Sequence, residues 1–451
     1  MGSSLSLFSC TQRKRGDDSA SEGDEDEEEE EEVSSDERNS SVIEGEVTET
    51  AVENNMSVGE DDTHPPELTE FPADFKKSFV NIKEEDKWRL RSGRYVEDII
   101  LVHSWILDTS CPLVKTWFSD QEWQEICTTN SKDDPKIDKF VENLILRYDV
   151  KTVDALRAAV MKPWLQEEYN HQKHFDAESL HLAVTDILRL WESNSLLNQP
   201  SSLERWYDVN VWGPLIDRFF LDLDSVALVR GEGCSLASAA RKNAQRTLET
   251  RQRLGSRGDG IFRSLITSEE YGSIECGKEV VPMATKTLQD RRKVGKLMKD
   301  MIKGRIQASN DSKMFAREIE AIGIVHCRLT ADFYSLDLPA GSIARLIHHD
   351  HCFVPVDSMK MDGNHVINVG EVLALIVNVF KHKRRLERSM AITSDAIPTK
   401  PSNHLQRVLS GEMIPSSDDI TESVAIPPTL STPRKNSEAV GKAKSSTTVV
   451  V

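Results

Sequence analysis

The negative charge of this chain is concentrated at its N-terminal end, and this segregation limits where a folded core can form. Residues 1–70 contain 4 Lys and Arg against 23 Asp and Glu, a net charge of 4 − 23 = −19. The whole chain of 451 residues has the same formal charge of −19, so the remaining residues are balanced. Such a dense run of like charges repels itself and has little apolar surface to bury. We therefore expect residues 1–70 to be disordered and the fold to begin after them.

A second segment with little core-forming potential begins near residue 391. It is rich in Ser, Thr and Pro and has no sustained apolar period, so burial could not offset the entropy lost on ordering it. We expect residues 391–451 to form a disordered tail. About 320 residues lie between the two tails, more than a single hydrophobic core usually organises. Two packed modules are therefore expected.

The first module, residues 85–200, has the apolar periodicity of amphipathic helices. Val153 and Leu156 illustrate the helical spacing, and signals for strands are few. All eight tryptophans of the chain lie between Trp88 and Trp212. Large aromatic side chains at such positions usually pack in a core. We therefore predict a helical module in which the tryptophans are packing residues.

The second module, residues 201–388, alternates between helical and strand patterns, which indicates an α/β or α+β sheet domain. Predicted strands cover, in chain order, 225–230, 260–265, 271–276, 320–327, 333–338 and 343–347. Predicted helices cover about 201–219, where Pro214 should cause an interruption, then 239–254, 288–306 and 366–386.

One segment of this module carries acids and a lysine on adjacent predicted strands. Asp259 stands between two glycines at the start of the first strand, and Glu275 lies near the end of the second, shortly before Lys278. Carboxylates on adjacent strand ends can hold divalent ions, which stabilise charge on a phosphate and generate hydroxide. A nearby lysine can orient water or neutralise charge. The pattern therefore indicates metal-dependent phosphodiester chemistry.

The element order and these positions resemble the PD-(D/E)XK nuclease superfamily, which has the restriction-endonuclease-like fold. The resemblance covers about residues 200–385. In that family a helix with an acidic residue precedes the sheet, one strand begins with Asp, and the next carries Glu followed by Lys. The Tyr-Gly-Ser-Ile-Glu block and the Leu-Met-Lys-Asp-Met helix are also similar to a family of uncharacterised fungal proteins, which implies no activity. The first resemblance implies a nuclease that uses Mg²⁺ or Mn²⁺.

Carried over by position, the resemblance implies a catalytic set of Asp259, Glu275 and Lys278. It implies that Asp259, Glu275 and Glu204 hold the metal, with Glu204 as the acid on the preceding helix. The sequence departs from the family pattern at Lys278, which follows Glu275 by three residues instead of two. A regular strand would place this lysine on the opposite face from the glutamate, unless a bulge at Gly277 restores the facing.

Two basic segments accompany these residues and favour a nucleic acid as a partner if they converge on one side. For the second segment a solvated outer face is the preferred interpretation, because Asp290 and Asp300 are interspersed in it. The first segment contains Arg241, Lys242, Arg246, Arg251, Arg253 and Arg257, and the second contains Lys286, Arg291, Arg292, Lys293, Lys296, Lys299, Lys303 and Arg305.

Other patterns argue against alternative sites. The seven cysteines are scattered without a CxxC pair, which speaks against a disulfide framework and a zinc knuckle and favours a reducing compartment. The run from His348 to Cys352 is interpreted as a polar turn and not as a metal site, because few of its ligands would share one face. Walker, GxGxxG and GxSxG motifs are absent from the sequence.

The first residues fit the pattern for lipid attachment. Gly2 is in place for N-myristoylation, Cys10 for palmitoylation, and the basic run 13–15 could meet anionic lipid. This predicts peripheral membrane association, although the pattern is short and the acidic run behind it would repel an anionic membrane. No apolar run is long enough for a transmembrane segment, and no signal peptide is recognised. We expect an intracellular protein, cytoplasmic or membrane-anchored, with the nucleus also open.

Two hypotheses remain from the sequence. The first is a restriction-endonuclease-like domain behind a helical module, with a metal-dependent site that is active or degenerate. The alternative is a non-catalytic interaction or scaffold protein, in which the acidic tail recruits a basic protein partner and the N-terminus tethers the chain to a membrane.

Overall fold

The computed structural model describes residues 82–99, 103–196, 204–247, 250–277, 283–310, 312–356, 359–361, 364–397, 424, 426–427 and 429. The first predicted tail, with Gly2 and Cys10, lies outside these residues, as does Lys278. Most of the second predicted tail also lies outside them.

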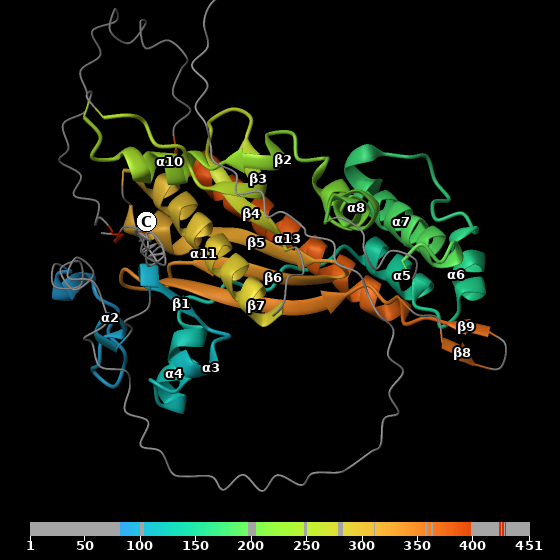
Figure 1. The fold of residues 1–451 in the computed structure, drawn as a ribbon, viewed down its shortest axis with the longest axis horizontal. Helices are drawn as coiled ribbons and strands as arrows, with labels where there is room; N and C mark the ends of the chain where they lie inside the picture. The colour runs from blue at the N-terminus through green and yellow to red at the C-terminus, as the bar shows by residue number, and fades with distance from the viewer. Residues whose placement is uncertain are drawn as a thin grey trace, which may run out of the picture. The chain divides into compact units, whose positions relative to one another are not determined.

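A seven-stranded mixed sheet forms the centre of the fold (Figure 1), in the order β1-β7-β6-β5-β4-β3-β2. The pairs β1–β7 and β4–β5 are parallel, and the other neighbours are antiparallel. A separate hairpin pairs β8 with β9. The strands are β1 Ile106–Asp108, β2 Val226–Cys234, β3 Arg257–Ser264, β4 Glu270–Gly277, β5 Glu320–Cys327, β6 Thr330–Asp337, β7 Ala344–Phe353, β8 Met359–Met361 and β9 Asn364–Val366.

Helices surround the sheet. They are η2 Glu84–Asp86, α2 Val96–Ile99, η3 His103–Trp105, α3 Pro112–Lys115, α4 Asp120–Thr128, α5 Lys139–Tyr148, α6 Val153–Val160, α7 His171–Glu192, α8 Glu204–Tyr207, η4 Asp208–Trp212, α9 Gly213–Leu215, η5 Asp217–Phe220, α10 Leu236–Asn243, α11 Met283–Ala308, α12 Lys313–Glu318 and α13 Val369–Ala396. The mixed α/β class predicted from the sequence is confirmed, and β2 to β7 lie where the strand patterns predicted them.

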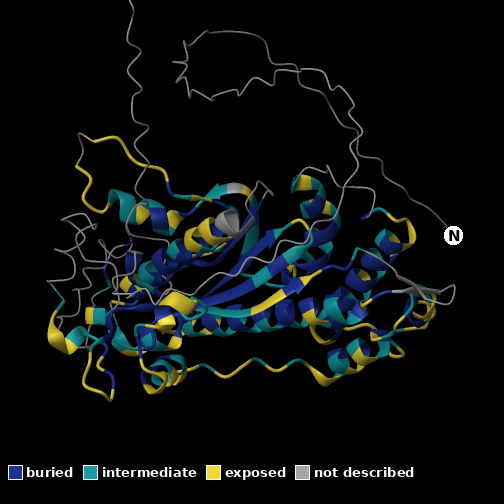
Figure 2. Ribbon diagram, turned by 60° about the horizontal axis from the view of Figure 1, so that its bottom comes forward, coloured by how far each residue is buried: buried dark blue, intermediate teal, exposed yellow. Residues whose placement is uncertain are grey.

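The two faces of the sheet pack against different helices, with α11 on one face and α13 on the other (Figure 1). Alternate residues of β5 show this division, because successive side chains of a strand point to opposite faces. Ile322 and Ile324 belong to the cluster that contains α7, α9 and α13, whereas Ala321 and Val325 pack with α11. Figure 2 shows the central strands as almost entirely buried. Gly323 allows α11 to lie close, since a Cβ there would come within 2.5 Å of Val294.

The hydrophobic core is continuous across the boundary that the sequence suggested near residue 200. Leu180 and Ile187 of α7 belong to the same buried cluster as Phe262 of β3 and Phe380 of α13. In addition, β1 comes from the segment expected to be helical and extends the sheet beside β7. The packing role of the tryptophans is confirmed, because all eight lie in or against a hydrophobic cluster.

Three further details differ from the sequence-based expectations. The last helix continues to Ala396, past the expected start of the tail, and Val424 is buried against the α11 side of the sheet. Residues 348–352, expected in a polar turn, belong to strand β7. Helix α10 ends at Asn243, and the Asn243 side chain accepts from the backbone of Arg253 in the returning loop.

In the part of the chain that the structure describes, no helix combines the length and the hydropathy needed to cross a membrane.

Candidate functional site

Glu275 is the central residue of the candidate site. It lies on β4, a strand buried along its whole length between β3 and β5, and its side chain points toward α11. One carboxylate oxygen, Oε2, accepts a hydrogen bond from Lys293 Nζ at 2.6 Å. The other, Oε1, is buried and has no hydrogen-bond partner among the described residues. Glu275 therefore has one carboxylate oxygen paired with Lys293 and one open oxygen, which has no hydrogen-bond partner among the described residues.

The Glu275 carboxylate lies between Gly258 and the partly exposed Lys293. Gly258 of β3 faces Oε1, because a Cβ built at this glycine would lie 3.5 Å from that atom. Lys293 is 43% exposed at its side chain, whereas Glu275 is only 2% exposed. Solvent thus reaches the pair from the side of the lysine.

Negative charges gather around Glu275. Burial raises its pKa to about 8, Lys293 opposes this shift, and the charges of Asp259 and Asp290 add to it. Asp290 lies on α11, and a Cβ at Gly277 would come within 3.3 Å of its Oδ2. Several carboxylates around one lysine favour a bound cation, because a divalent ion reverses the penalty for keeping them ionised.

Asp259 connects β3 to β4 at this point. Its Oδ2 accepts a hydrogen bond from the backbone N–H of Cys276 at 2.7 Å. Burial is the main reason that the pKa values of Asp208 and Glu275 are raised, and the charge of Asp259 contributes to both shifts, so Asp259 lies in the neighbourhood of both acids. The structure therefore brings together Asp259 and Glu275, the two strand acids that the sequence singled out.

Glu204 lies elsewhere. It begins α8, on the other side of β4, and its side chain hydrogen-bonds the Cys276 thiol, whose pKa is raised mainly by burial and further by Asp208 and Glu204. Cys276 follows Glu275 directly, so the two side chains point to opposite faces of the strand. The expectation that Glu204 joins Glu275 in one metal site is therefore wrong, because the strand separates them.

Lys293 of α11 places an amino group beside Glu275, whereas Lys278 lies outside the described residues. The position two residues after Glu275, where the family pattern places lysine, is Gly277. Lys293 was not predicted as a site residue. The lysine was expected on the strand after Glu275, and the helix that carries Lys293 was interpreted as a solvated face. A signal was present: Asp290 and Lys293 stand three residues apart and next to the apolar positions Val294 and Leu297, so they share a helix face turned toward the sheet.

Comparison with known protein families, with curated proteins and with solved structures finds no match. The interpretation of the site therefore rests on its geometry.

The interpretation of α11 as a solvated outer face is wrong for two of its basic residues. Lys299 is buried and donates to the backbone oxygen of Ser104 at 2.5 Å. Arg305 is buried as well and donates to Ser389 Oγ at 2.6 Å and to the backbone oxygen of Glu320 at 2.9 Å. Because α11 packs across the sheet, Lys299 and Arg305 point inward. Their hydrogen bonds connect α11 to the segment before β1, to β5 and to α13.

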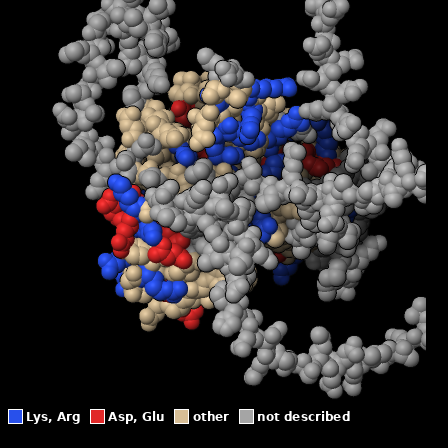
Figure 3. Space-filling model, turned by 60° about the vertical axis from the view of Figure 1, so that its left-hand side comes forward, with Lys and Arg blue, Asp and Glu red and all other residues tan. Residues whose placement is uncertain are grey.

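Other basic residues gather near Lys293 on the surface. Burial, together with the nearby charges of Arg241 and Arg292, lowers the pKa of Lys296 to about 8. Arg292 is exposed, and Arg241 pairs with Asp300 at 2.9 Å. Figure 3 shows Lys and Arg side chains collected in the upper part of one face, whereas both charges mix lower down. We call Arg241, Arg292, Lys293 and Lys296 the basic cluster.

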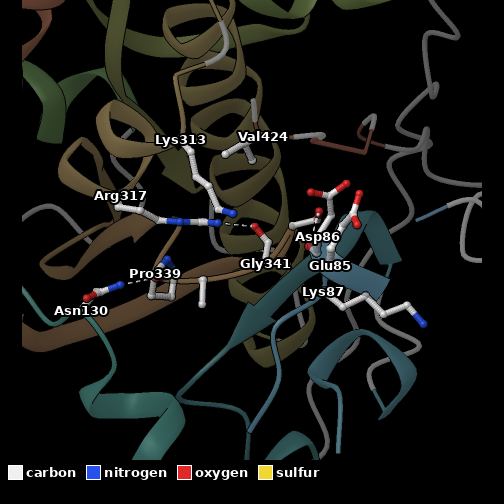
Figure 4. Close-up of a pocket in the computed structure, with 11 residues that line it drawn as sticks. Glu85, Asp86, Lys87, Asn130, Lys313, Arg317, Pro339, Gly341 and Val424 are labelled. Atoms are coloured by element: carbon white, nitrogen blue, oxygen red, sulfur yellow. Dashed lines mark hydrogen bonds between the residues drawn. The ribbon is translucent and has the colours of Figure 1, made fainter. Parts of the chain in front are cut away.

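The pocket in Figure 4 is a separate feature. It has a volume of about 210 Å³ and is lined by residues that include Lys313 of α12, Arg317 and Val424. The Arg317 guanidinium donates to the backbone oxygens of Leu338 and Gly341, so its cation holds the turn between β6 and β7. None of the residues that line this pocket belongs to the Glu275 site.

Proposed function

We propose that this protein is a divalent-metal-dependent phosphodiesterase of the PD-(D/E)XK type that cleaves nucleic acid. The observation that carries the proposal is the Glu275 carboxylate: buried, neutralised on one oxygen by Lys293, open on the other, and adjacent to Asp259. Asp259 and Glu275 would hold Mg²⁺ or Mn²⁺, and Lys293 would take the role expected of Lys278.

The order of elements supports this proposal. The helical segment α8 to α9 precedes the antiparallel strands β2, β3 and β4, and α11 then crosses the sheet to β5, which is parallel to β4. This is the arrangement that the resemblance implies, with the two acids on consecutive strands. A resemblance in the order of helices and strands concerns only the fold. The functional argument therefore depends on the residues of the site.

The residues divide the chemistry between them. A bound divalent ion would stabilise charge on the phosphate and lower the pKa of a water molecule. Lys293 can orient that water or neutralise the phosphate, while the basic cluster attracts the nucleic-acid backbone. In the hydrolysis the water oxygen bonds to phosphorus, the ester P–O bond breaks, and the leaving oxygen takes up a proton.

Lys293→Met tests the assignment of the lysine. The methionine keeps the unbranched stem but removes the charge beside Glu275, so we expect the cleavage rate to fall about 100-fold or more. The assay measures cleavage of DNA and RNA with Mg²⁺, with Mn²⁺ and with a chelator. Lys139→Met is the matched control, because Lys139 is exposed and its ion pair is with Glu142 on the same helix, α5.

Equal cleavage by wild type and Lys293→Met would contradict the proposed role of Lys293. If the wild type binds nucleic acid but does not cleave it with either metal, the catalytic proposal fails and the non-catalytic interaction protein is favoured.

The basic cluster is expected to set the salt dependence of binding. Replacing Arg292 and Lys296 with alanine should weaken binding to duplex DNA and reduce the slope of log K against log salt by about 2, since each lost phosphate contact contributes about 0.9. Fluorescence anisotropy at several salt concentrations measures this slope. The control replaces Lys115 and Lys139, which lie on α3 and α5. An unchanged slope in the Arg292 and Lys296 variant would remove the cluster from the binding surface.

A further inference from the structure

We propose that Asp208, Cys276 and His326 form a second metal site, which takes a single zinc-class transition-metal ion on the face of the sheet opposite Glu275. This site does not depend on the proposed phosphodiesterase activity. Its residues come from three elements: Asp208 from η4, Cys276 from β4 and His326 from β5.

The sheet register places two of the ligands side by side. Cys276 and His326 are direct partners in the parallel β4–β5 pair, so their side chains leave the sheet on the same face. The neighbours Ile274 and Ile324 on that face pack in the cluster with Trp212. The two ligands therefore point away from α11 and toward the helical segment that contains Asp208.

A π-helical turn positions the third ligand. Helix α8 is followed by the π turn η4 from Asp208 to Trp212, and Pro214 stands two residues after its end. Pro214 has no backbone N–H and cannot continue the regular α-helical ladder, which favours an irregular turn before it. Such turns often occur at functional sites. This one places Asp208 over Cys276 and His326.

The distances suit one ion. One ligand atom from each of the three residues lies within 4.8 Å of the other two, and Nε2 of His326 is 3.7 Å from Oδ1 of Asp208. Ligand atoms around tetrahedral zinc lie about 3.3–3.8 Å apart, given Zn–N, Zn–O and Zn–S bonds of about 2.0–2.3 Å. The separations in the structure exceed these by at most about 1 Å, which a small movement of the Asp208 and Cys276 side chains would close.

His326 provides the independent sign of a missing ligand. It is completely buried, and neither ring nitrogen has a hydrogen-bond partner within the described part of the chain. Oδ1 of Asp208 is also buried without one. Buried polar atoms in folded proteins are nearly always satisfied, because an unsatisfied one costs about 1–3 kcal/mol. An ion bound between the two residues would satisfy Oδ1 and one ring nitrogen.

The ring is also held in a fixed orientation. Trp212 stacks on His326 with ring centroids 5.0 Å apart, and the Trp212 indole N–H donates to the backbone oxygen of Arg328 at 2.9 Å. A ligand that is oriented before the metal arrives loses little entropy on binding. Trp212 therefore acts as a positioning residue for His326.

The donor set selects the class of metal. One thiolate, one imidazole and one carboxylate suit zinc and similar transition metals, whereas Mg²⁺ and Ca²⁺ prefer oxygen ligands alone. A thiolate, a carboxylate and Zn²⁺ together are neutral, which suits a buried place. The ion would tie the π turn to the two central strands.

The first test is direct metal binding by the full chain. Wild-type protein is stripped with a chelator and titrated with Co²⁺, and we expect one equivalent to produce a thiolate-to-cobalt charge-transfer band and the d–d bands of a tetrahedral site. Zn²⁺ should displace the cobalt and raise the melting temperature. Absence of these bands in folded wild-type protein would overturn the proposal.

The second test uses variants. Cys276→Ser and His326→Gln should each weaken Co²⁺ binding at least about 10-fold, and Cys276→Ser should also lose the charge-transfer band. Cys352→Ser is the matched control, because Cys352 is another buried cysteine and lies on β7. If Cys276→Ser keeps the band, or if Cys352→Ser loses it, the ion is not held by the proposed ligands.

Discussion

Replacing Glu275 with glutamine is expected to reduce metal-dependent cleavage about 100-fold or more while the fold stays intact. The amide has the same size as the carboxylate and can still accept the hydrogen bond from Lys293 Nζ. It lacks the negative charge that a divalent ion requires, and such an ion supplies several kcal/mol of transition-state stabilisation. The loss should appear with both Mg²⁺ and Mn²⁺.

The same variant separates a catalytic role from a structural one. Glu275 is a buried acid, and removing a buried charge does not by itself destabilise a protein when the remaining partner can be hydrated. Lys293 is partly exposed and can turn to solvent. We therefore expect the free energy of unfolding in urea to change by less than about 1 kcal/mol. Glu387→Gln, at a partly exposed pair with Arg384, is the control for activity and stability.

Two outcomes would contradict this prediction. Cleavage at the wild-type rate by Glu275→Gln would remove Glu275 from the site. Loss of cleavage together with a loss of several kcal/mol in stability would show that Glu275 supports the fold and does not itself bind the metal.

Replacing Arg345 with methionine is expected to destabilise the protein by about 3–5 kcal/mol. Arg345 is completely buried on β7 and forms two hydrogen bonds to Asp337 at 3.1 and 2.7 Å. Its Nη1 also donates to the backbone oxygens of Ile126, Cys127 and Thr129 at the end of α4. Methionine fills much of the volume, but it leaves the buried Asp337 carboxylate with only Lys132, at 3.2 Å, as an ion-pair partner among the described residues. The three backbone oxygens also lose this donor.

Urea denaturation measures this effect, and a double variant sharpens it. If the cost comes mainly from the buried Asp337 carboxylate that has lost Arg345, Arg345→Met combined with Asp337→Leu should be more stable than Arg345→Met alone. Arg189→Met is the control, because this arginine is exposed and should change stability by less than about 0.5 kcal/mol. A loss of less than 1 kcal/mol in Arg345→Met would contradict the prediction.

The sequence predicted most of the sheet because its strands have local signatures. The apolar runs that became β2 to β7 are short, separated by turn residues and visible without knowledge of their partners. Strand β1 has only three residues and no such signature. It is a strand because it pairs with the edge of β7. A pairing between residues so far apart in the chain produces no periodic pattern in the local sequence.

The sequence likewise predicted only some of the residues of the candidate sites. Asp259 and Glu275 stand out because glycines and apolar residues surround them on adjacent strands. The apolar positions Val294 and Leu297 mark the inward face of α11 in the sequence, but only the tertiary structure shows that Lys293 on this face lies against Glu275. His326 looked like any residue of an apolar strand until the register placed it beside Cys276.

The sequence by itself determined the alternation of strands and helices after residue 201 and the acids on two consecutive strands, because these depend on periodicity and turn chemistry within a few residues. Only the tertiary structure decided that Lys293 neutralises Glu275, that Glu204 lies behind the strand, and that Asp208 and His326 meet at Cys276. The physical reason is that pairing across a sheet and the crossing of α11 depend on contacts between distant segments, which local patterns do not encode.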